Sequence, residues 1–427
     1  MLELVAPLVA FAVLLALGVP VFVSMGLSSV AFLTLSDTMN TFVFTNAMFT
    51  GLNEFALIAV PLFIVTGDAI FEAGMADELL DFVETLVGGL QTGFGSATIL
   101  GCGLFATISG ANTADAATIG RIALDRLEEI GYPRDYAAAM IAGGASTGVL
   151  IPPSISYIVA GIMLGIPSST LFLAAFVPGT LILLGLAATN VLMNRRHSYE
   201  AGESDFLGLR AVGAAGWRAK YALLVPVVLL GGIYAGVFTP TEAAAVAIGV
   251  TVLISGLRGR LSIGDLPVVF ERSALVNAIV SPNIATGIVF SQVLAGVGVP
   301  TALANALLGT SQDFYVVTAL MLLFFLAAGA VMEITPNIII LGPLFLPIAT
   351  RVGMSPVHFT VFFISALGVG FITPPIGINL YVLSGVSGES VHDIARRAVP
   401  FTLGMLLTVL VIGWFPELYM WIVGGGA

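Results

Sequence analysis

Hydroxyl and amide side chains gather beside glycines and prolines in two parts of an otherwise apolar sequence. The first cluster lies at residues 109–113 and 148–154, and the second at residues 335–337 and 370–375. Their hydroxyl, amide and unpaired carbonyl oxygens are ligands suited to a hard cation such as Na⁺. Because proline lacks an amide hydrogen, a helix broken at proline leaves upstream carbonyls without donors. The predicted cation-binding residues are Ser109, Gly110, Asn112, Thr113, Gly148, Pro152, Pro153, Ser154, Thr335, Asn337, Gly370, Thr373, Pro374 and Pro375.

Anion binding is the second chemistry that these clusters suggest. A helix that resumes after a break has a new N-terminal end, which carries partial positive charge. No lysine or arginine lies inside the predicted apolar spans away from their ends. A carboxylate would therefore depend on amides, hydroxyls and bound cations. The predicted substrate-binding residues are Ser109, Asn112, Ser154, Thr335 and Asn379.

Four acidic residues lie in or beside apolar runs, where an ionised side chain is costly and often functional. Asp115 and Glu333 flank the two clusters, so either could carry a proton in place of a coupled ion. Asp115 could equally cap the helix that follows the first cluster. Asp68 and Glu242 are expected to brace helix packing. A simpler interpretation also stays open, in which glycine and proline only kink the helices and the hydroxyls bond to their own backbone.

The two clusters belong to a stretch that occurs twice, at residues 109–178 and 331–400. A constant spacing of 222 residues aligns the copies without a gap. The aligned pairs are Thr113 with Thr335, Gly120 with Gly342, Gly131 with Gly353, Gly148 with Gly370, Pro152 with Pro374, Pro153 with Pro375, and Pro178 with Pro400. Most of these residues are glycine or proline, which mark backbone geometry. The sequence therefore predicts one broken-helix unit built twice.

The composition predicts a membrane protein. The sequence is 58% hydrophobic and 9% charged, with a mean hydropathy of +1.08. Continuous apolar runs of about twenty residues recur, which predicts membrane-spanning α-helices and not the alternating strands of a barrel. The basic residues are few and clustered, and the net charge is −11, so we expect no nucleic acid partner. Cys102 is the single cysteine, which excludes a disulfide within one chain.

Two halves joined by a linker are expected to position the clusters. The first half covers residues 1–195, the linker residues 196–220 and the second half residues 221–427. Each half should contain an interfacial arm, a helical hairpin and a broken helix. These lie at about 75–88, 92–130 and 136–164 in the first half, and at about 258–272, 313–349 and 358–386 in the second. We also expect hairpin tips at 110–112 and 335–337, a polar connector up to Asn53, and a span at 54–71 interrupted at Pro61.

The basic residues predict an inverted topology for the two halves. When the basic segment around residues 195–220 is placed in the cytoplasm and the spans alternate from it, 13 of the 14 lysines and arginines lie inside. Only Arg351 lies outside. The two hairpins then enter from opposite faces, the N-terminus is a retained transmembrane helix, and both termini are periplasmic. Inverted repeats with discontinuous helices place a binding site near the middle of the membrane, which favours an alternating-access carrier over a channel.

Motifs in both copies carry a family resemblance. The runs LFATISGANTADAATIG and GGASTGVLIPPSI in the first copy, and LGPLFLPIATRVGMSPVHF and GVGFITPPIGINLYV in the second, are similar to one kind of membrane subunit. They resemble the large (M, DctM-type) subunit of tripartite ATP-independent periplasmic (TRAP) transporters over essentially the whole chain. One departure falls at the first tip, where many relatives have Ser-Gly-Ser-Ser and this chain has Ser109, Gly110, Ala111 and Asn112.

The resemblance implies an elevator-type carrier of the ion transporter superfamily, in which a domain bearing both hairpins moves against a scaffold. It implies import of an organic acid, such as a C4-dicarboxylate or sialic acid, across a bacterial or archaeal inner membrane, driven by a Na⁺ gradient. It also implies two partners, which are a small four-helix membrane subunit and a periplasmic substrate-binding protein. The family's cation regions fall on Ser109, Gly110, Gly148 and residues 152–154, and on Thr335, Gly370 and residues 373–375.

Two alternatives stay open beside this expectation. One is a stand-alone Na⁺- or H⁺-coupled dicarboxylate or anion carrier that works without a binding protein. The other is an ion channel. No catalytic residue set, no transition metal and no cofactor apart from the coupling ion is expected, because no nucleophile triad, metal-ligand spacing or nucleotide motif stands out.

Overall fold

The chain folds into helices, and no strand occurs in the residues that the structure describes. The computed structural model describes residues 2–35, 41–87, 93–200, 209–262 and 264–424. In this part of the chain, seven helical segments are long and apolar enough to cross a membrane, or eight if a pair bent by 74° counts as one span. Helices satisfy their own backbone hydrogen bonds, as lipid requires. The prediction of an all-α polytopic membrane protein is confirmed.

The helices divide between the two predicted halves. Those of the first half and the linker are α1 (Leu2–Ala16), α2 (Val21–Leu35), α3 (Thr41–Leu52), α4 (Ala59–Glu72), α5 (Met75–Val87), α6 (Gly93–Ser109), α7 (Asn112–Ile130), α8 (Arg134–Ala145), α9 (Ile155–Leu164), α10 (Ser168–His197) and α11 (Leu209–Arg218). Those of the second half are α12 (Lys220–Tyr234), α13 (Pro240–Leu257), α14 (Leu266–Gly296), α15 (Val299–Thr310), α16 (Phe314–Val331), α17 (Ile334–Arg351), α18 (Pro356–Gly370), α19 (Ile378–Ser387) and α20 (Val391–Trp414).

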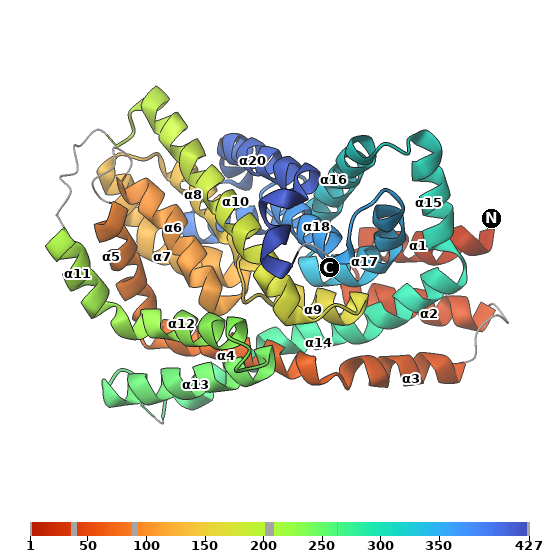
Figure 1. Ribbon diagram of the computed structural model, residues 1–427, viewed down its shortest axis with the longest axis horizontal. Coiled ribbons are helices and arrows are strands. Elements are labelled where there is room, and N and C mark those ends of the chain that lie inside the picture. Colours follow the sequence, from red (N-terminus) through yellow and green to blue (C-terminus); the bar gives the residue numbers. More distant parts are fainter. Residues whose placement is uncertain (1, 36–40, 88–92, 201–208, 263, 425–427) are drawn as a thin grey trace.

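One layer of long helices supports the rest of the fold. Helices α3, α4, α13 and α14 run along the lower edge of Figure 1, where α14 packs against α2, α3 and α4, and α13 packs against α4. We call α2, α3, α4, α13 and α14 the scaffold helices. The hairpins and broken helices lie above this layer, with α6 contacting α4, and α17 contacting α14.

Both predicted hairpins are pairs of helices, but only the first tip lies where the sequence predicts it. Helices α6 and α7 are separated by Gly110 and Ala111. In the second hairpin the break falls at Met332 and Glu333, so the predicted tip at 335–337 is wrong. Those residues form the first turn of α17 because the Glu333 carboxylate accepts a hydrogen bond from the Thr335 amide at 2.9 Å, and proline is tolerated in a first helical turn.

Both predicted broken helices are interrupted in the structure. The first consists of α8, a short 3₁₀ turn (Ser146–Val149) and α9, and the second consists of α18 and α19. The aligned bonds Pro152–Pro153 and Pro374–Pro375 are both cis. Gly110 and Gly377 adopt positive φ angles of 60° and 59°, which glycine reaches without steric cost.

The second interfacial arm is not where the sequence analysis placed it. Residues 258–272 do not form a separate arm, because α13 ends at Leu257 and α14 runs unbroken from Leu266 through Arg272 to Gly296. The arm expected at 75–88 lies on α5. Adding the repeat spacing of 222 residues to α5 gives 297–309, which is close to α15. The second arm was predicted at 258–272, and not at α15, because the basic residues make that segment polar.

Two of the expected connecting segments contain helices, and one expected break is absent. The segment expected to be a polar connector contains helix α3, and the expected linker contains helix α11. Pro61 does not interrupt its span, because it lies in the first turn of α4. Residues 88 and 263 of the predicted arms, residue 92 of the first hairpin and residues 201–208 of the linker lie outside the described residues.

Ion pairs connect the α5 arm to the elements on both sides. Glu78 of α5 pairs with Arg258 and Arg260, which follow α13, at 2.7 and 2.8 Å. Glu84 of α5 pairs with Arg126 of α7 at 2.5 Å. Burial raises the pKa of the Glu84 carboxyl, and the Arg126 guanidinium opposes that rise. The arm therefore joins the first hairpin to the scaffold helices.

Candidate functional site

The first hairpin tip is organised around a buried carboxylate. Asp115 lies in the first turn of α7 and is fully buried. The Ser109 hydroxyl donates a hydrogen bond to its Oδ1, and the Ala111 amide donates to the Ser109 Oγ at 3.3 Å. Oδ2 of Asp115 has no hydrogen-bond partner among the described residues. Because a buried charge is costly unless it is paired, this oxygen is suited to a cation or a proton.

Two glycines let the first broken helix approach this tip closely. A Cβ atom on Gly148 would lie 2.4 Å from Asp115 Oδ2 and 3.0 Å from the Asn112 amide nitrogen. A Cβ atom on Gly110 would lie 3.2 Å from the Pro153 carbonyl oxygen. The free carboxylate oxygen therefore faces the backbone at Gly148, between the hairpin tip and the first broken helix.

Asn379 ties the second broken helix into the same site. The Asn112 side-chain amide donates to Asn379 Oδ1 at 3.1 Å. The Asn379 amide donates in turn to the Ala142 carbonyl oxygen at 3.1 Å and to the Ser146 hydroxyl at 3.2 Å. Asn112, Asn379 and Ser146 are all buried. Elements from both halves of the chain therefore meet in one polar junction.

Replacing Asn379 by alanine should loosen this junction. The change leaves the buried Asn112 amide without its acceptor, whereas the Ser146 hydroxyl keeps its hydrogen bond to the Ala142 carbonyl oxygen at 3.0 Å. A buried polar group left without a partner costs about 1–3 kcal/mol. We expect a lower melting temperature in nanodiscs for Asn379→Ala and for Asn112→Ala. The double variant should lose less than the sum of the two single losses, because both break the same bond. Additive losses would show that the two amides do not interact.

The second tip is held by its own hydrogen bonds. The buried Asn337 amide donates to the carbonyl oxygens of Ala328, Met332 and Glu333 at 3.1–3.3 Å. The amides of Ile376 and Gly377 both donate to the Ala330 carbonyl oxygen at 3.2 Å. A Cβ atom on Gly370 would lie 2.3 Å from the Gly329 carbonyl carbon. The second tip thus packs directly on the second break, as the first tip packs on the first break.

The hydroxyls of the two breaks bond to their own backbone. Ser154 donates to the Val149 carbonyl oxygen at 3.0 Å, and Thr373 donates to the Val369 carbonyl oxygen at 2.8 Å. Pro152 and Pro153 are buried, whereas Pro374 and Pro375 are exposed. The Ser154 Oγ also accepts from the Ser156 amide at 3.3 Å, which caps α9. These are the backbone contacts that the simpler interpretation predicts for the two hydroxyls.

The structure brings together most of the first predicted cluster, with one residue from the second half. Asn379 joins Ser109, Gly110, Asn112 and Gly148, while Thr113 lies half-buried in the first turn of α7. Thr335 and Asn337 belong to the second tip, and no hydrogen bond between the two tips occurs in the described part of the chain.

Sequence reasoning left two residues out of the site. Ser146 was missed, because a serine within a helical run resembles a helix-packing residue. Asp115 was weighed only as a cap or a proton carrier. Asp115 lies three residues after Asn112, close to the predicted break at Gly110. This position was the signal in the sequence that could have placed its carboxylate in the cation site.

The helical fold is similar to the folds of two solved membrane transporters. The chain shares its fold with the crystal structure of the Alcanivorax borkumensis YdaH transporter, with a TM-score of 0.60 and 13% identity over 88% of this chain and 89% of that one. It is also similar to Neisseria gonorrhoeae MtrF, with a TM-score of 0.55 and 13% identity over 88% and 84% of the two chains. At such identities the likeness concerns the fold alone.

The chain belongs to the family described as the DctM component of the tripartite ATP-independent periplasmic transporter. The model of this family matches residues 8–418 of the chain. It is 34% identical to the isethionate TRAP transporter permease protein DctMQ of Oleidesulfovibrio alaskensis, over 97% of this chain and 65% of that protein. It is 32% identical to the C4-dicarboxylate TRAP transporter large permease protein DctM of Rhodobacter capsulatus, over 96% and 97% of the two chains. It is 30% identical to the sialic acid TRAP transporter large permease protein SiaM of Vibrio cholerae, over 95% and 94%. The family resemblance seen in the sequence is confirmed.

Proposed function

We propose that this large permease component imports an organic acid by Na⁺-coupled alternating access. The observation that carries the proposal is the free, buried Oδ2 of Asp115, which faces the backbone at Gly148. A carboxylate oxygen among backbone and hydroxyl oxygens fits the preference of Na⁺ for hard ligands. The relatives named for isethionate, C4-dicarboxylate and sialic acid support an organic acid as the substrate.

Coupling follows from the position of the cation. Na⁺ bound at Asp115 neutralises the buried charge and holds the first tip against the first broken helix. The Asn112–Asn379 bond passes this order to the second broken helix. The ion shifts the population toward the substrate-competent form because it binds that form more tightly. The two hairpins, loaded with ion and acid, then cross the membrane as one body against the scaffold helices. The second tip, at Thr335 and Asn337, moves with the first.

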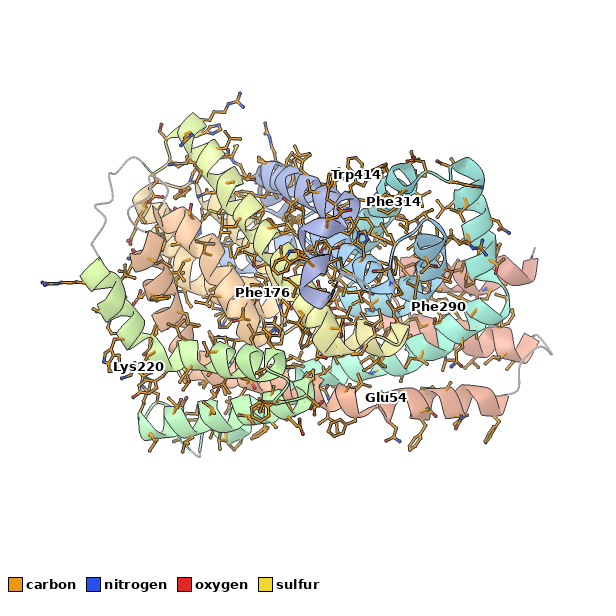
Figure 2. All side chains as sticks on the ribbon, in the orientation of Figure 1. Glu54, Phe176, Lys220, Phe290, Phe314 and Trp414 are labelled. Atoms are coloured by element: carbon orange, nitrogen blue, oxygen red, sulfur yellow. The ribbon has the colours of Figure 1, made fainter. Side chains whose placement is uncertain are left out.

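The carrier works as part of a larger assembly. A small four-helix membrane subunit packs with this chain in the bacterial inner membrane, and a periplasmic binding protein delivers the acid. Both termini are periplasmic, and the basic residues around 195–220 face the cytoplasm. Phe176 of α10, labelled in Figure 2, is one of many large apolar side chains that are exposed on the surface, together with Leu184 and Leu192 of the same helix. Such a surface suits contact with lipid or with a membrane partner.

Uptake into proteoliposomes tests this function. The chain is reconstituted with its proposed small membrane subunit, and its proposed periplasmic binding protein is loaded with radiolabelled succinate, isethionate or N-acetylneuraminate. We expect accumulation of one of these acids only with the binding protein present and an inward Na⁺ gradient. Equal uptake without the binding protein would favour a stand-alone carrier. Uptake that follows a pH gradient and ignores Na⁺ would contradict sodium coupling.

A further inference from the structure

A cavity of about 250 Å³ lies between the first hairpin and the scaffold helices. Its walls come from α4, α6, α7 and α14. Ser109 and Ala111 of the hairpin tip line it, so it adjoins the site of the buried carboxylate. Two arginines also line it, Arg121 of α7 and Arg272 of α14. The cavity thus lies between the first hairpin, which moves in the proposed carrier, and the scaffold helices, which stay fixed.

The charges around this cavity leave one arginine without a carboxylate. Arg272 lies 3.6 Å from the Glu72 carboxylate and over the Phe71 ring. Asp68, the one acidic residue among the described residues of the cavity wall, accepts a hydrogen bond from the Ser273 hydroxyl at 2.6 Å. Arg121 is exposed and makes no ion pair or side-chain hydrogen bond with any residue of the described chain.

We propose that this cavity is the binding site of the transported anion, and that Arg121 binds its carboxylate or sulfonate group. The inference deepens the proposed function and rests on it. A guanidinium presents paired N–H donors that match a carboxylate or sulfonate. The apolar side chains of Ile64, Phe105 and Val276 line the cavity and contact the carbon chain of the acid. No arginine was predicted at the substrate, because Arg121 is one of the 13 basic residues that the predicted topology places on the cytoplasmic side.

The volume of the cavity narrows the substrate class. Pockets for drug-sized ligands span about 300–1,000 Å³, and this cavity lies below that range. It therefore suits an acid of a few carbons, such as a C4-dicarboxylate or a small sulfonate, better than a nine-carbon sugar acid. Because Ser109 touches both the cavity and Asp115, an anion here lies beside the bound cation, where each charge favours the other.

Anion binding to the purified full chain in nanodiscs tests this inference. Titration calorimetry with succinate, isethionate and N-acetylneuraminate is carried out on wild type, Arg121→Gln and Arg121→Lys. Arg396→Gln is the matched control, since Arg396 is also an exposed arginine but lies on α20, outside the cavity. We expect wild type and the control to bind succinate or isethionate. Arg121→Gln should bind at least about tenfold more weakly, and Arg121→Lys should fall between them.

Several outcomes would overturn the inference. They are wild-type affinity in Arg121→Gln, equal weakening in Arg396→Gln, preferred binding of N-acetylneuraminate, and no binding of any of the three anions by wild type. The melting temperature in NaCl against choline chloride is measured on the same samples. Arg121→Gln should keep the Na⁺-dependent rise, so loss of anion binding with this rise intact supports the cavity. Absence of the rise in wild type would instead count against the proposed sodium site.

Discussion

Replacing Asp115 by asparagine is expected to abolish the response of the protein to Na⁺. Asparagine keeps the shape of the side chain and an oxygen to accept the Ser109 hydrogen bond, but it removes the charge at the buried position facing Gly148. Wild type should melt at a higher temperature in NaCl than in choline chloride, and Asp115→Asn should melt at the same temperature in both. Sodium-driven uptake should fall by at least about 100-fold, because a transport-competent state that lacks its cation is several kcal/mol less favourable.

The variant also separates the role of the charge from a role in folding. An unpaired buried carboxylate destabilises a fold, so in choline chloride Asp115→Asn should be at least as stable as wild type. Asp81→Asn, an exposed acidic residue of α5, is the control and should keep the Na⁺ response. If Asp115→Asn keeps its Na⁺ response but loses a pH response, Asp115 carries a proton and the cation lies elsewhere.

Gly148→Ala is expected to have the second largest effect. The new methyl group would lie 2.4 Å from Asp115 Oδ2 and 3.0 Å from the Asn112 amide nitrogen, a separation at which one of the two elements must shift. Overpacking of this kind costs about 1–3 kcal/mol. The shift displaces the free carboxylate oxygen, so the Na⁺ concentration that gives half-maximal uptake should rise by about tenfold or more.

Gly385→Ala provides the matched control for this variant. Gly385 lies in α19 of the second broken helix, and a Cβ atom there would meet no other atom within 4 Å. Alanine is a better helix former than glycine, so the control should be neutral or slightly stabilising. If Gly148→Ala shows the wild-type dependence of uptake on Na⁺, the space between the first tip and the first break does not hold the ion.

The class of the fold and the first half of the site could be predicted from residue types and spacing. Apolar runs of spanning length force helices in lipid, and glycine or proline marks where those helices stop. Gly110 has a positive φ and lies close to the Pro153 carbonyl oxygen, a combination that would strain a larger residue. The first helix therefore breaks at the glycine that marks the break in the sequence. At the second tip Pro336 misled the prediction, because it lies in the first turn of α17, where proline is tolerated, and does not break a helix.

Long-range contacts could not be predicted in the same way. Asn379 joins residues more than two hundred positions away, and no local pattern specifies which amide of the second broken helix turns toward Ser146. The position of Arg121 in a cavity wall likewise depends on how α7 lies across the cavity from α4 and α14, and not on its distance from the end of an apolar run. Periodicity fixes which helices exist, but side-chain contacts between distant helices arise only in the packed fold.

The central claim is that sodium at the first tip travels with the acid, and simultaneous flux of both is its most direct test. Proteoliposomes holding the complete assembly receive radioactive sodium outside and binding protein loaded with the acid, with the membrane potential clamped. We predict that sodium enters only when the loaded binding protein is present, in a fixed ratio to the acid, and that Asp115→Asn stops both fluxes. Acid uptake without any accompanying sodium would contradict the account.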